Sequence, residues 1–347
     1  MVKFYERYTH ERNYGCRIRE YIYNRLRTVT LENELLRVSV LADKGTDIFE
    51  FLYKPQDLDF MWHSFNGIKS LNSITVTKQN PGGSFLDFYE GGWQELFPNI
   101  NDDCEYMGAH LGMHGEVCLL PWQYSVLVDK PEEIRVKFQV RTVRTPFYLE
   151  KELGMRSEDP TLYIRERVIN EGCIELQFMW GHHPAFGPLF LDDNCVIQVP
   201  ENVKARTYWV NPGGNSVLPL DKEFVWPQVI GSDGRQWDVS RVPSPDSKIV
   251  QMYYLYDLPR GWYMLKNTKR NVGFELKWDK NIFPILWVWG AYGGFEQYPW
   301  YGRNYNLALE PWSAVPHNLA ELAKTGKGIR IRPQEEIETV IEATAAV

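Results

Sequence analysis

A strict alternation of apolar and polar residues runs through the stretch Ile134-Arg135-Val136-Lys137-Phe138-Gln139-Val140-Arg141. Successive side chains of a β-strand point to opposite faces, so this period of two predicts a strand with one buried and one solvated face. Comparable stretches predict further strands at residues 36–40, 47–53, 161–169, 273–278, 284–289 and 337–343. Strands at such short intervals favour packed antiparallel sheets over alternating strands and helices.

Helical periodicity is scarce in this chain. The best candidate for a helix is residues 317–324, which Gly326 is placed to end. Turn signals separate the predicted strands, at Asn80-Pro81-Gly82-Gly83, Asn211-Pro212-Gly213-Gly214 and Ser232-Asp233-Gly234. The Pro- and Gly-rich residues 211–246 lie between predicted strands, so we interpret them as an excursion at the mouth of a sandwich and not as a linker. We therefore expect one all-β domain over residues 1–347, a large antiparallel β-sandwich with few short helices.

The composition of the chain argues against several classes of binding partner. The chain has 347 residues and a net charge of −7, which argues against nucleic acid or an anionic membrane as the main partner. No run approaches the roughly 20 apolar residues of a membrane span, and residues 1–7 are charged and lack the apolar core of a secretory signal. The five cysteines contain no CxxC pair, which argues against a zinc ribbon or a redox motif. We expect a cytoplasmic protein with free thiols, and a homodimer is one of the assemblies left open.

Aromatic residues are unusually frequent, with 13 Trp and 20 Tyr. Such side chains fill cores, and they also line pockets that bind small molecules. Stacking on the apolar face of a sugar ring is one such use. The composition leaves both interpretations open.

Two separate segments offer groups that can transfer protons. His182-His183-Pro184 holds adjacent imidazoles, whose ordinary pKa is the nearest to neutrality of any side chain. Pro184 favours extended backbone at His183, and neighbouring residues of a strand point to opposite faces, so we expect one histidine of the pair to face a given pocket. Glu310 ends the apolar run Leu307-Ala308-Leu309. If it is partly desolvated, its pKa should rise and make it a better base near pH 7.

Two further clusters carry polar side chains beside glycines. Trp93, Gln94 and Glu95 follow Gly91-Gly92 and suit the recognition of hydroxyl groups, unless Glu95 is satisfied by backbone donors in a buried turn. His110 and His114 are spaced as a metal-binding pair would be on a helix. Glycines flank His114 and no helical pattern surrounds it, so a loop histidine that hydrogen-bonds a substrate is the alternative, and so is a purely structural one.

In these residues the chain resembles the aldose 1-epimerase superfamily, the galactose mutarotase-like proteins. The resemblance rests on an ordered set that spans nearly the whole chain: His114-Gly115 with Trp122 downstream, His183-Pro184 followed by Phe186, and Glu310-Pro311 before a C-terminal strand. Arg332-Pro333-Gln334-Glu335-Glu336 is similar to the family's Pro-Gly-Glu turn, with Gln334 in place of the glycine. The fold implied is a large antiparallel β-sandwich, the supersandwich of the galactose mutarotase-like proteins.

The activity implied by the resemblance is the interconversion of α and β sugar anomers without metal or cofactor. Glu310 would remove the proton of the anomeric hydroxyl while His183 protonates the ring oxygen. The ring opens to the aldehyde, the C1–C2 bond rotates, and closure with reversed roles gives the other anomer. His114 would correspond to the family's substrate-orienting histidine. The other expected substrate-binding residues are Trp93, Gln94, Glu95, Trp180, His182 and Trp289.

The chain departs from the family pattern in two places. Galactose mutarotases carry an arginine upstream of the first histidine, where this chain has Gly92-Trp93-Gln94-Glu95. A family aspartate has no unambiguous match, since Asp233, Asp238 and Asp257 all qualify. No compact Arg/Lys cluster indicates a sugar-phosphate site either. The identity of the sugar therefore stays open.

Two other classes of function stay open on the sequence. One is a non-catalytic carbohydrate-binding protein on the same scaffold, which would keep Trp93, Trp180 and Trp289. The other is a metal-dependent sugar isomerase of cupin type that uses His110, His114 and Glu116.

Overall fold

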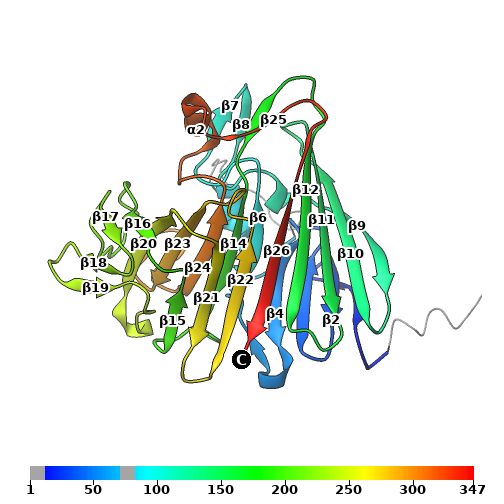
Figure 1. Cartoon of the computed structure of the whole chain (residues 1–347), viewed down its shortest axis with the longest axis horizontal. Coiled ribbons are helices and arrows are strands. Elements are labelled where there is room, and N and C mark those ends of the chain that lie inside the picture. The colour runs from blue at the N-terminus through cyan, green and yellow to red at the C-terminus, as the bar shows by residue number, and fades with distance from the viewer. Residues whose placement is uncertain (1–11, 71–82) are drawn as a thin grey trace, which may run out of the picture.

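The computed structural model of the protein describes residues 12–70 and 83–347. The N-terminal stretch at residues 1–7 and the turn residues Asn80-Pro81-Gly82 lie outside the described residues. Two large antiparallel sheets lie face to face and form a sandwich (Figure 1). The predicted all-β class with few short helices is therefore confirmed.

The first sheet has twelve strands in the described part of the chain. Its strands, in spatial order, are β1 (Arg17–Tyr23), β2 (Leu26–Glu32), β3 (Leu36–Leu41), β4 (Asp47–Tyr53), β6 (Trp93–Leu96), β14 (Gly181–Phe186), β24 (Tyr305–Trp312), β23 (Ile285–Tyr292), β20 (Ile249–Tyr256), β16 (Lys204–Thr207) and β17 (Glu223–Val225), with β5 (Leu58–Asp59) paired to β4. Segments from both halves of the sequence therefore meet in its centre, where β6, β14, β24 and β23 lie side by side.

The second sheet has eight strands among the described residues. In spatial order they are β15 (Cys195–Gln198), β21 (Gly261–Asn267), β22 (Val272–Trp278), β26 (Glu336–Ala346), β12 (Thr161–Asn170), β11 (Phe147–Arg156), β10 (Glu133–Arg141) and β9 (Gln123–Asp129). The part of the chain that the structure describes also has three two-stranded ribbons: β7 (Cys104–Tyr106) with β8 (Ala109–Leu111), β13 (Leu176–Phe178) with β25 (Ile329–Ile331), and β18 (Gln228–Ile230) with β19 (Gln236–Asp238).

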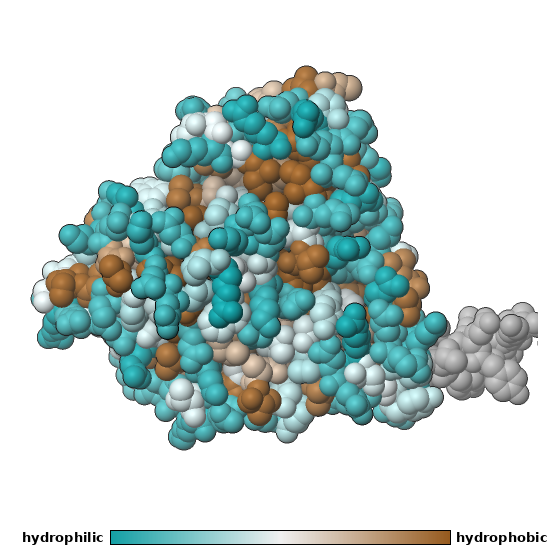
Figure 2. Space-filling view, viewed as in Figure 1, coloured by the Kyte–Doolittle hydropathy of each residue, from teal (hydrophilic) through white to brown (hydrophobic). Residues whose placement is uncertain are grey.

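The alternating stretch at residues 134–141 lies in strand β10, as predicted. Its apolar members Ile134, Val136 and Phe138 are fully buried, while the residues between them are partly exposed. They belong to the core between the two sheets, where Phe51 of β4 meets Phe274 of β22 with ring centroids 5.1 Å apart. Hydrophilic residues cover most of the face that Figure 2 shows. The other six predicted strands correspond to β3, β4, β12, β22, β23 and β26.

Short helices lie outside the sandwich. The α-helix α2 (Leu319–Thr325) confirms the predicted helix: Asn318 and Glu321 form a capping box at its start, and Gly326 ends it with a φ of 69°. The α-helix α1 (Gly83–Phe88) was not predicted, and single 3₁₀ turns occur at η3 (Lys54–Gln56), η5 (Val117–Leu119) and η6 (Pro245–Ser247). No helix in the described ranges is long and apolar enough to cross a membrane.

A second apolar cluster covers the other face of the twelve-stranded sheet. It includes Tyr89, Trp287, Trp289 and Trp312. The central strands of this sheet are therefore buried on both faces, which explains why β23 and β24 are almost entirely buried although they belong to an antiparallel sheet.

Candidate active site

His183 and Glu310 are neighbours across two strands in the centre of the twelve-stranded sheet. Strands β14 and β24 run antiparallel, with Gly181 opposite Trp312 and Ala185 opposite Ala308. The same register puts His183 opposite Glu310, halfway between those pairs. Because cross-strand neighbours share a face of the sheet, two residues far apart in sequence come together through strand pairing alone.

The two side chains lie within reach of each other. Nε2 of His183 lies 3.4 Å from Oε1 of Glu310, and the two residues are 4% and 0% exposed. The other carboxyl oxygen, Oε2, accepts the indole N–H of Trp312 at 3.1 Å. Oε1 has no hydrogen-bond partner in the described part of the chain. This oxygen is therefore the free acceptor of the pair.

Burial shifts the pKa values of Glu310 and His183 in opposite directions. It raises the pKa of the Glu310 carboxyl well above its ordinary value, and the hydrogen bond from Trp312 works against this shift. Burial also lowers the pKa of His183 well below its ordinary value, and the nearby His114 adds to that effect. Both directions favour a proton on the carboxyl and a neutral imidazole. The pair can thus hold one proton and exchange it between its members.

His114 reaches the same place from the turn after β8. Its backbone φ is 61°, and the next residue, Gly115, has a φ of 79°. A Cβ atom at Gly115 would lie 2.2 Å from the carbonyl oxygen of Phe97, so this close approach of two backbones requires glycine. Nδ1 of His114 lies 2.8 Å from the carbonyl oxygen of Ile100. Because a carbonyl can only accept, Nδ1 carries the proton and Nε2 remains an acceptor.

Replacing His114 should change how stability depends on pH. Burial lowers the pKa of His114 to about 4, whereas an unfolded histidine titrates near 6.5. The unfolded chain therefore binds more protons between these values, so the imidazole contributes stability above pH 6.5 that is lost as the pH falls to 4. We expect wild type to lose about 3 kcal/mol more than His114→Asn between pH 7 and pH 4. Asparagine is chosen because it tolerates a positive φ.

Urea unfolding at the two pH values measures this difference. Glu310 titrates in both proteins, so its contribution largely cancels. His110→Asn, which removes a histidine that is 80% exposed, is the matched control and should unfold with the pH dependence of wild type. Equal pH dependence of wild type and His114→Asn would contradict the prediction.

A cavity of about 310 Å³ opens above the pair, and His183, Glu310 and His114 all line it. This volume is at the lower end of the range for small-molecule sites, roughly 300–1,000 Å³. Its wall is largely aromatic, with Trp289 against His183 at 5.7 Å and against Trp300 at 5.6 Å between ring centroids. No lysine or arginine of the described residues lines the cavity. The cavity is therefore suited to a small uncharged molecule with apolar faces and hydroxyl groups.

Four of the expected substrate-binding residues lie elsewhere. Trp93, Glu95, Trp180 and His182 face the core between the two sheets and do not line the cavity. Nε2 of His182 lies 3.0 Å from Glu166, and the indole of Trp180 donates to Glu95 at 2.8 Å. Their positions contradict the expected contact with substrate. The reason is the period of two: His182 is next to His183 on β14, and Trp93 and Glu95 stand on either side of Gln94, which pairs with His183.

Gln94 lies on the cavity side of the sheet but does not reach the cavity. It pairs with His183 across β6 and β14, and its side-chain N–H donates to the carbonyl of Gly91. Its expected contact with substrate is therefore not supported by its position. Of the expected set, the structure brings together His183, Glu310, His114 and Trp289.

The three candidate metal ligands do not converge. His110 is exposed and lies 3.8 Å from Glu105, whereas His114 is buried in the cavity. Glu116 accepts hydrogen bonds from the backbone of Val143 and Arg144. Within residues 12–70 and 83–347, no group of three or more His, Cys, Asp or Glu side chains is arranged to hold a metal ion.

The three candidates for the family aspartate also lie outside the cavity wall. Asp257 pairs with Lys204 on the surface, and Asp233 and Asp238 belong to the β18–β19 ribbon and its turn. The carboxylate that does line the cavity beside Glu310 is Asp102. The sequence offered no signal for it, because it stands in an irregular loop.

Sequence reasoning missed part of the aromatic wall. Trp287 and Trp312 stack with ring centroids 5.3 Å apart and line the cavity with Tyr89 and Trp300. Two of these could have been found: Trp287 stands two residues before Trp289 and Trp312 two after Glu310, so each shares a strand face with a residue already selected. Tyr89 follows the unpredicted helix α1, and no pattern indicated its place.

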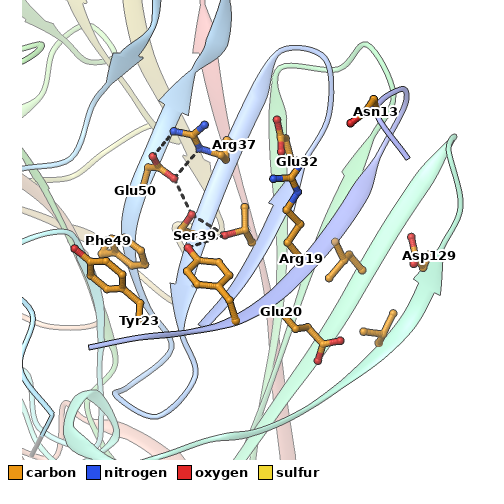
Figure 3. Close-up of a pocket in the computed structure, with 14 residues that line it drawn as sticks. Asn13, Arg19, Glu20, Tyr23, Glu32, Arg37, Ser39, Phe49, Glu50 and Asp129 are labelled. Carbon is orange, nitrogen blue, oxygen red and sulfur yellow. Dashed lines mark hydrogen bonds and ion pairs between the residues drawn. The ribbon is translucent and has the colours of Figure 1, made fainter. Parts of the chain in front are cut away.

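A second cavity, of about 1270 Å³, lies on the outer face of β1 to β4. Its charged side chains are largely paired with one another: Arg37 donates to Glu50, which also accepts the hydroxyl of Ser39 at 2.7 Å (Figure 3). Arg17 pairs with Glu32 beside it. We therefore place the candidate site in the smaller cavity, which holds the free carboxyl oxygen of Glu310.

Comparisons with known proteins agree with this fold. Residues 24–345 match the family described as "Domain of unknown function (DUF4432)". No curated protein matches the sequence. Similar solved structures include a proposed aldose 1-epimerase from Klebsiella pneumoniae, with 13% identity, a TM-score of 0.70 and coverage of 95% of this chain and 83% of that one.

Two further solved structures are similar, and each match covers 95% of this chain and 98% of the other chain. One is a galactose mutarotase related enzyme from Lactobacillus acidophilus, with 16% identity and a TM-score of 0.60. The other is a galactose mutarotase-like protein from Clostridium acetobutylicum, with 13% identity and a TM-score of 0.64. At such identities the likeness is one of fold. The chain therefore belongs to the DUF4432 family, and it has the fold of the galactose mutarotase-like proteins.

Proposed function

We propose that the protein interconverts the α and β anomers of a small uncharged sugar. The observation that carries this proposal is the pairing of His183 with Glu310 at the floor of an aromatic cavity, 3.4 Å apart and almost fully buried. Anomer exchange needs one group that takes a proton from the anomeric hydroxyl and one that gives a proton to the ring oxygen. Structures described as mutarotase-related share the fold, which supports the same conclusion.

The number of protons that His183 and Glu310 hold together fits this reaction. Ring opening starts from ionised Glu310 and protonated His183, and it ends with the proton on the carboxyl and a neutral imidazole. Ring closure returns both protons. The pair therefore needs one proton in total throughout the cycle, and the raised pKa of Glu310 with the lowered pKa of His183 favours the open-chain arrangement. Each positioned proton transfer typically contributes about 10²–10⁴-fold.

The wall of the cavity supports the choice of substrate class. Indole and phenol rings of Trp289, Trp300 and Tyr89 offer flat apolar surfaces. The polar lining groups other than the catalytic pair are uncharged or acidic. The amides of Asn211 and Gln297 can donate to or accept from a hydroxyl, and Nε2 of His114 and the carboxyl of Asp102 can accept from one. An acidic cavity without a lining Lys or Arg in the described ranges disfavours sugar phosphates and uronic acids.

The test is a panel of single anomers, freshly dissolved and followed by polarimetry or NMR exchange spectroscopy. We expect acceleration of mutarotation for at least one neutral hexose, pentose or deoxy sugar, and slower exchange of the matching 6-phosphate or uronic acid. Binding of a sugar without any acceleration would show a carbohydrate-binding protein instead. No acceleration of any member of the panel would contradict the proposal.

A further inference from the structure

Tyr89 stands directly behind the imidazole of His183. Its hydroxyl oxygen lies 3.3 Å from Nδ1 of His183, on the side of the ring away from Glu310. Tyr89 is 1% exposed and directly follows helix α1. Within the described ranges, no other side chain hydrogen-bonds this nitrogen. The two ring nitrogens of His183 therefore have separate partners, a phenol at Nδ1 and a carboxyl at Nε2.

Aromatic neighbours hold the Tyr89 ring in place. It stacks on Phe85 with ring centroids 4.8 Å apart and meets Trp62 edge-on at 5.6 Å. Trp300 closes a further side at 6.0 Å, and the imidazole of His183 itself lies at 5.4 Å. A ring packed in this way cannot swing, so the position of its hydroxyl is fixed relative to Nδ1.

We infer that Tyr89 is a positioning residue: its hydroxyl oxygen accepts the Nδ1–H of His183 and so leaves Nε2 as the nitrogen that exchanges a proton with Glu310 and the substrate. This inference rests on the proposed function. The reason is the proton count of the pair. When Glu310 is protonated, its O–H can donate to Nε2, and the single proton of the neutral imidazole then belongs on Nδ1. When His183 is protonated, Nδ1–H still donates to the same oxygen.

A phenol at this position has a consequence that a carboxylate would not have. An anionic partner would stabilise the imidazolium and raise its pKa, as happens when aspartate orients a catalytic histidine. Neutral Tyr89 orients the ring without adding that charge. His114 has the same arrangement, since its Nδ1 donates to the neutral carbonyl of Ile100. In both neutral imidazoles Nε2 is therefore the unprotonated nitrogen, which can accept a proton.

Tyr89→Phe tests the inference with two readouts. Phenylalanine keeps the ring and removes the acceptor of the Nδ1 proton. The single proton of His183 should then move to Nε2, where Oε1 of Glu310 can accept it when the carboxyl proton is on Oε2. Long-range ¹H–¹⁵N NMR of histidine-labelled protein distinguishes the two tautomers, and His183→Gln assigns the signal. We expect the Nδ1–H tautomer in wild type and the Nε2–H tautomer in Tyr89→Phe. We also expect kcat for anomer exchange to fall about tenfold while KM changes less, as loss of one hydrogen bond implies.

Tyr253→Phe is the matched control. Its hydroxyl donates to the carbonyl of Val239 at 2.9 Å in the core between the sheets, so it removes one buried hydroxyl outside the cavity. It should leave the His183 tautomer and kcat unchanged. An Nε2–H tautomer in wild type would overturn the inference, and so would an unchanged tautomer and kcat in Tyr89→Phe. If wild type accelerates no anomer, the proposed function fails, but the NMR result still decides the role of Tyr89 because it does not depend on turnover.

Discussion

Glu310→Gln is expected to lower kcat for anomer exchange by about 10²–10⁴-fold. Glutamine keeps the size of the side chain and can still accept the indole N–H of Trp312, which lies 3.1 Å from Oε2. What it removes is the carboxyl that gains and gives back a proton opposite His183 in the proposed mechanism. KM should change little, because the shape of the cavity and its aromatic wall remain. Polarimetry with the best sugar of the panel measures the effect.

The stability of Glu310→Gln should not fall with its activity, and at high pH it should equal or exceed that of wild type. The pKa of Glu310 is raised in the folded state, so its contribution to stability is present at low pH and is lost as the pH rises through that value. Glutamine has no such loss, so Glu310→Gln should unfold at equal or higher urea concentration than wild type at pH 8. Glu175→Gln, an exposed carboxylate paired with Arg330, is the control and should alter neither property. A variant that keeps wild-type kcat would remove Glu310 from the mechanism.

Strand positions could be predicted because they depend on local pattern. Residues 47–53 were predicted as a strand and form β4 with the same bounds. Strands β23 and β24 are buried on both faces, so they have no alternation, and their pairing partners cannot be derived from periodicity. The register that puts His183 opposite Glu310 is set by the whole sheet. The sequence indicates His183 and Glu310 as candidate site residues, but it does not show that they lie side by side.

The alternation of side chains along a strand decides which of the expected binding residues lie on the cavity side. His183 and His182 are adjacent, and the strand turns one toward the cavity and the other toward the core. The sequence predicted that one of them would face a pocket, and the resemblance to mutarotases selected His183. The same rule applies to β6, where Gln94 and its neighbours Trp93 and Glu95 must point to opposite faces. The alternation therefore puts Trp93, Glu95 and His182 on the core side of the sheet, and they do not line the cavity.

Part of the cavity wall comes from segments in which no sequence pattern indicated a site residue. Tyr89, Asp102 and Trp300 reach the cavity from segments without strand or helix periodicity. Their places depend on how the chain folds over the outer face of the twelve-stranded sheet. The positive φ of His114 is a further case, since nothing in the sequence except the following glycine indicated it. Long-range packing decides such positions.

Lys151→Met is expected to destabilise the protein by about 3–5 kcal/mol at pH 8, the usual effect of leaving a buried charge without its partner. Lys151 lies on β11 and is 6% exposed. Its ammonium group lies 2.8 Å from Glu95, 3.7 Å from Glu166 and 2.9 Å from the hydroxyl of Thr46. Both carboxylates are almost fully buried, so bulk solvent does not compensate for loss of the ammonium group. Urea unfolding monitored by tryptophan fluorescence measures the loss.

The pH dependence of this loss identifies its cause. Burial already raises the pKa of Glu95 in the fold, whereas His182 and Lys151 outweigh burial and lower the pKa of Glu166. Without the ammonium group, both pKa values should be higher than they are in wild type. The resulting stability is present below about pH 4 and is lost as the pH rises, so the gap between Lys151→Met and wild type should narrow from pH 8 to pH 5. Adding Glu95→Gln should recover part of the loss, since Gln can still accept the indole N–H of Trp180. The control Lys137→Met removes a lysine that is 33% exposed and pairs with Glu150 at 3.1 Å, and it should cost at most about 1 kcal/mol. If the two lysine variants lost equal stability, the buried cluster would contribute no more than a surface ion pair.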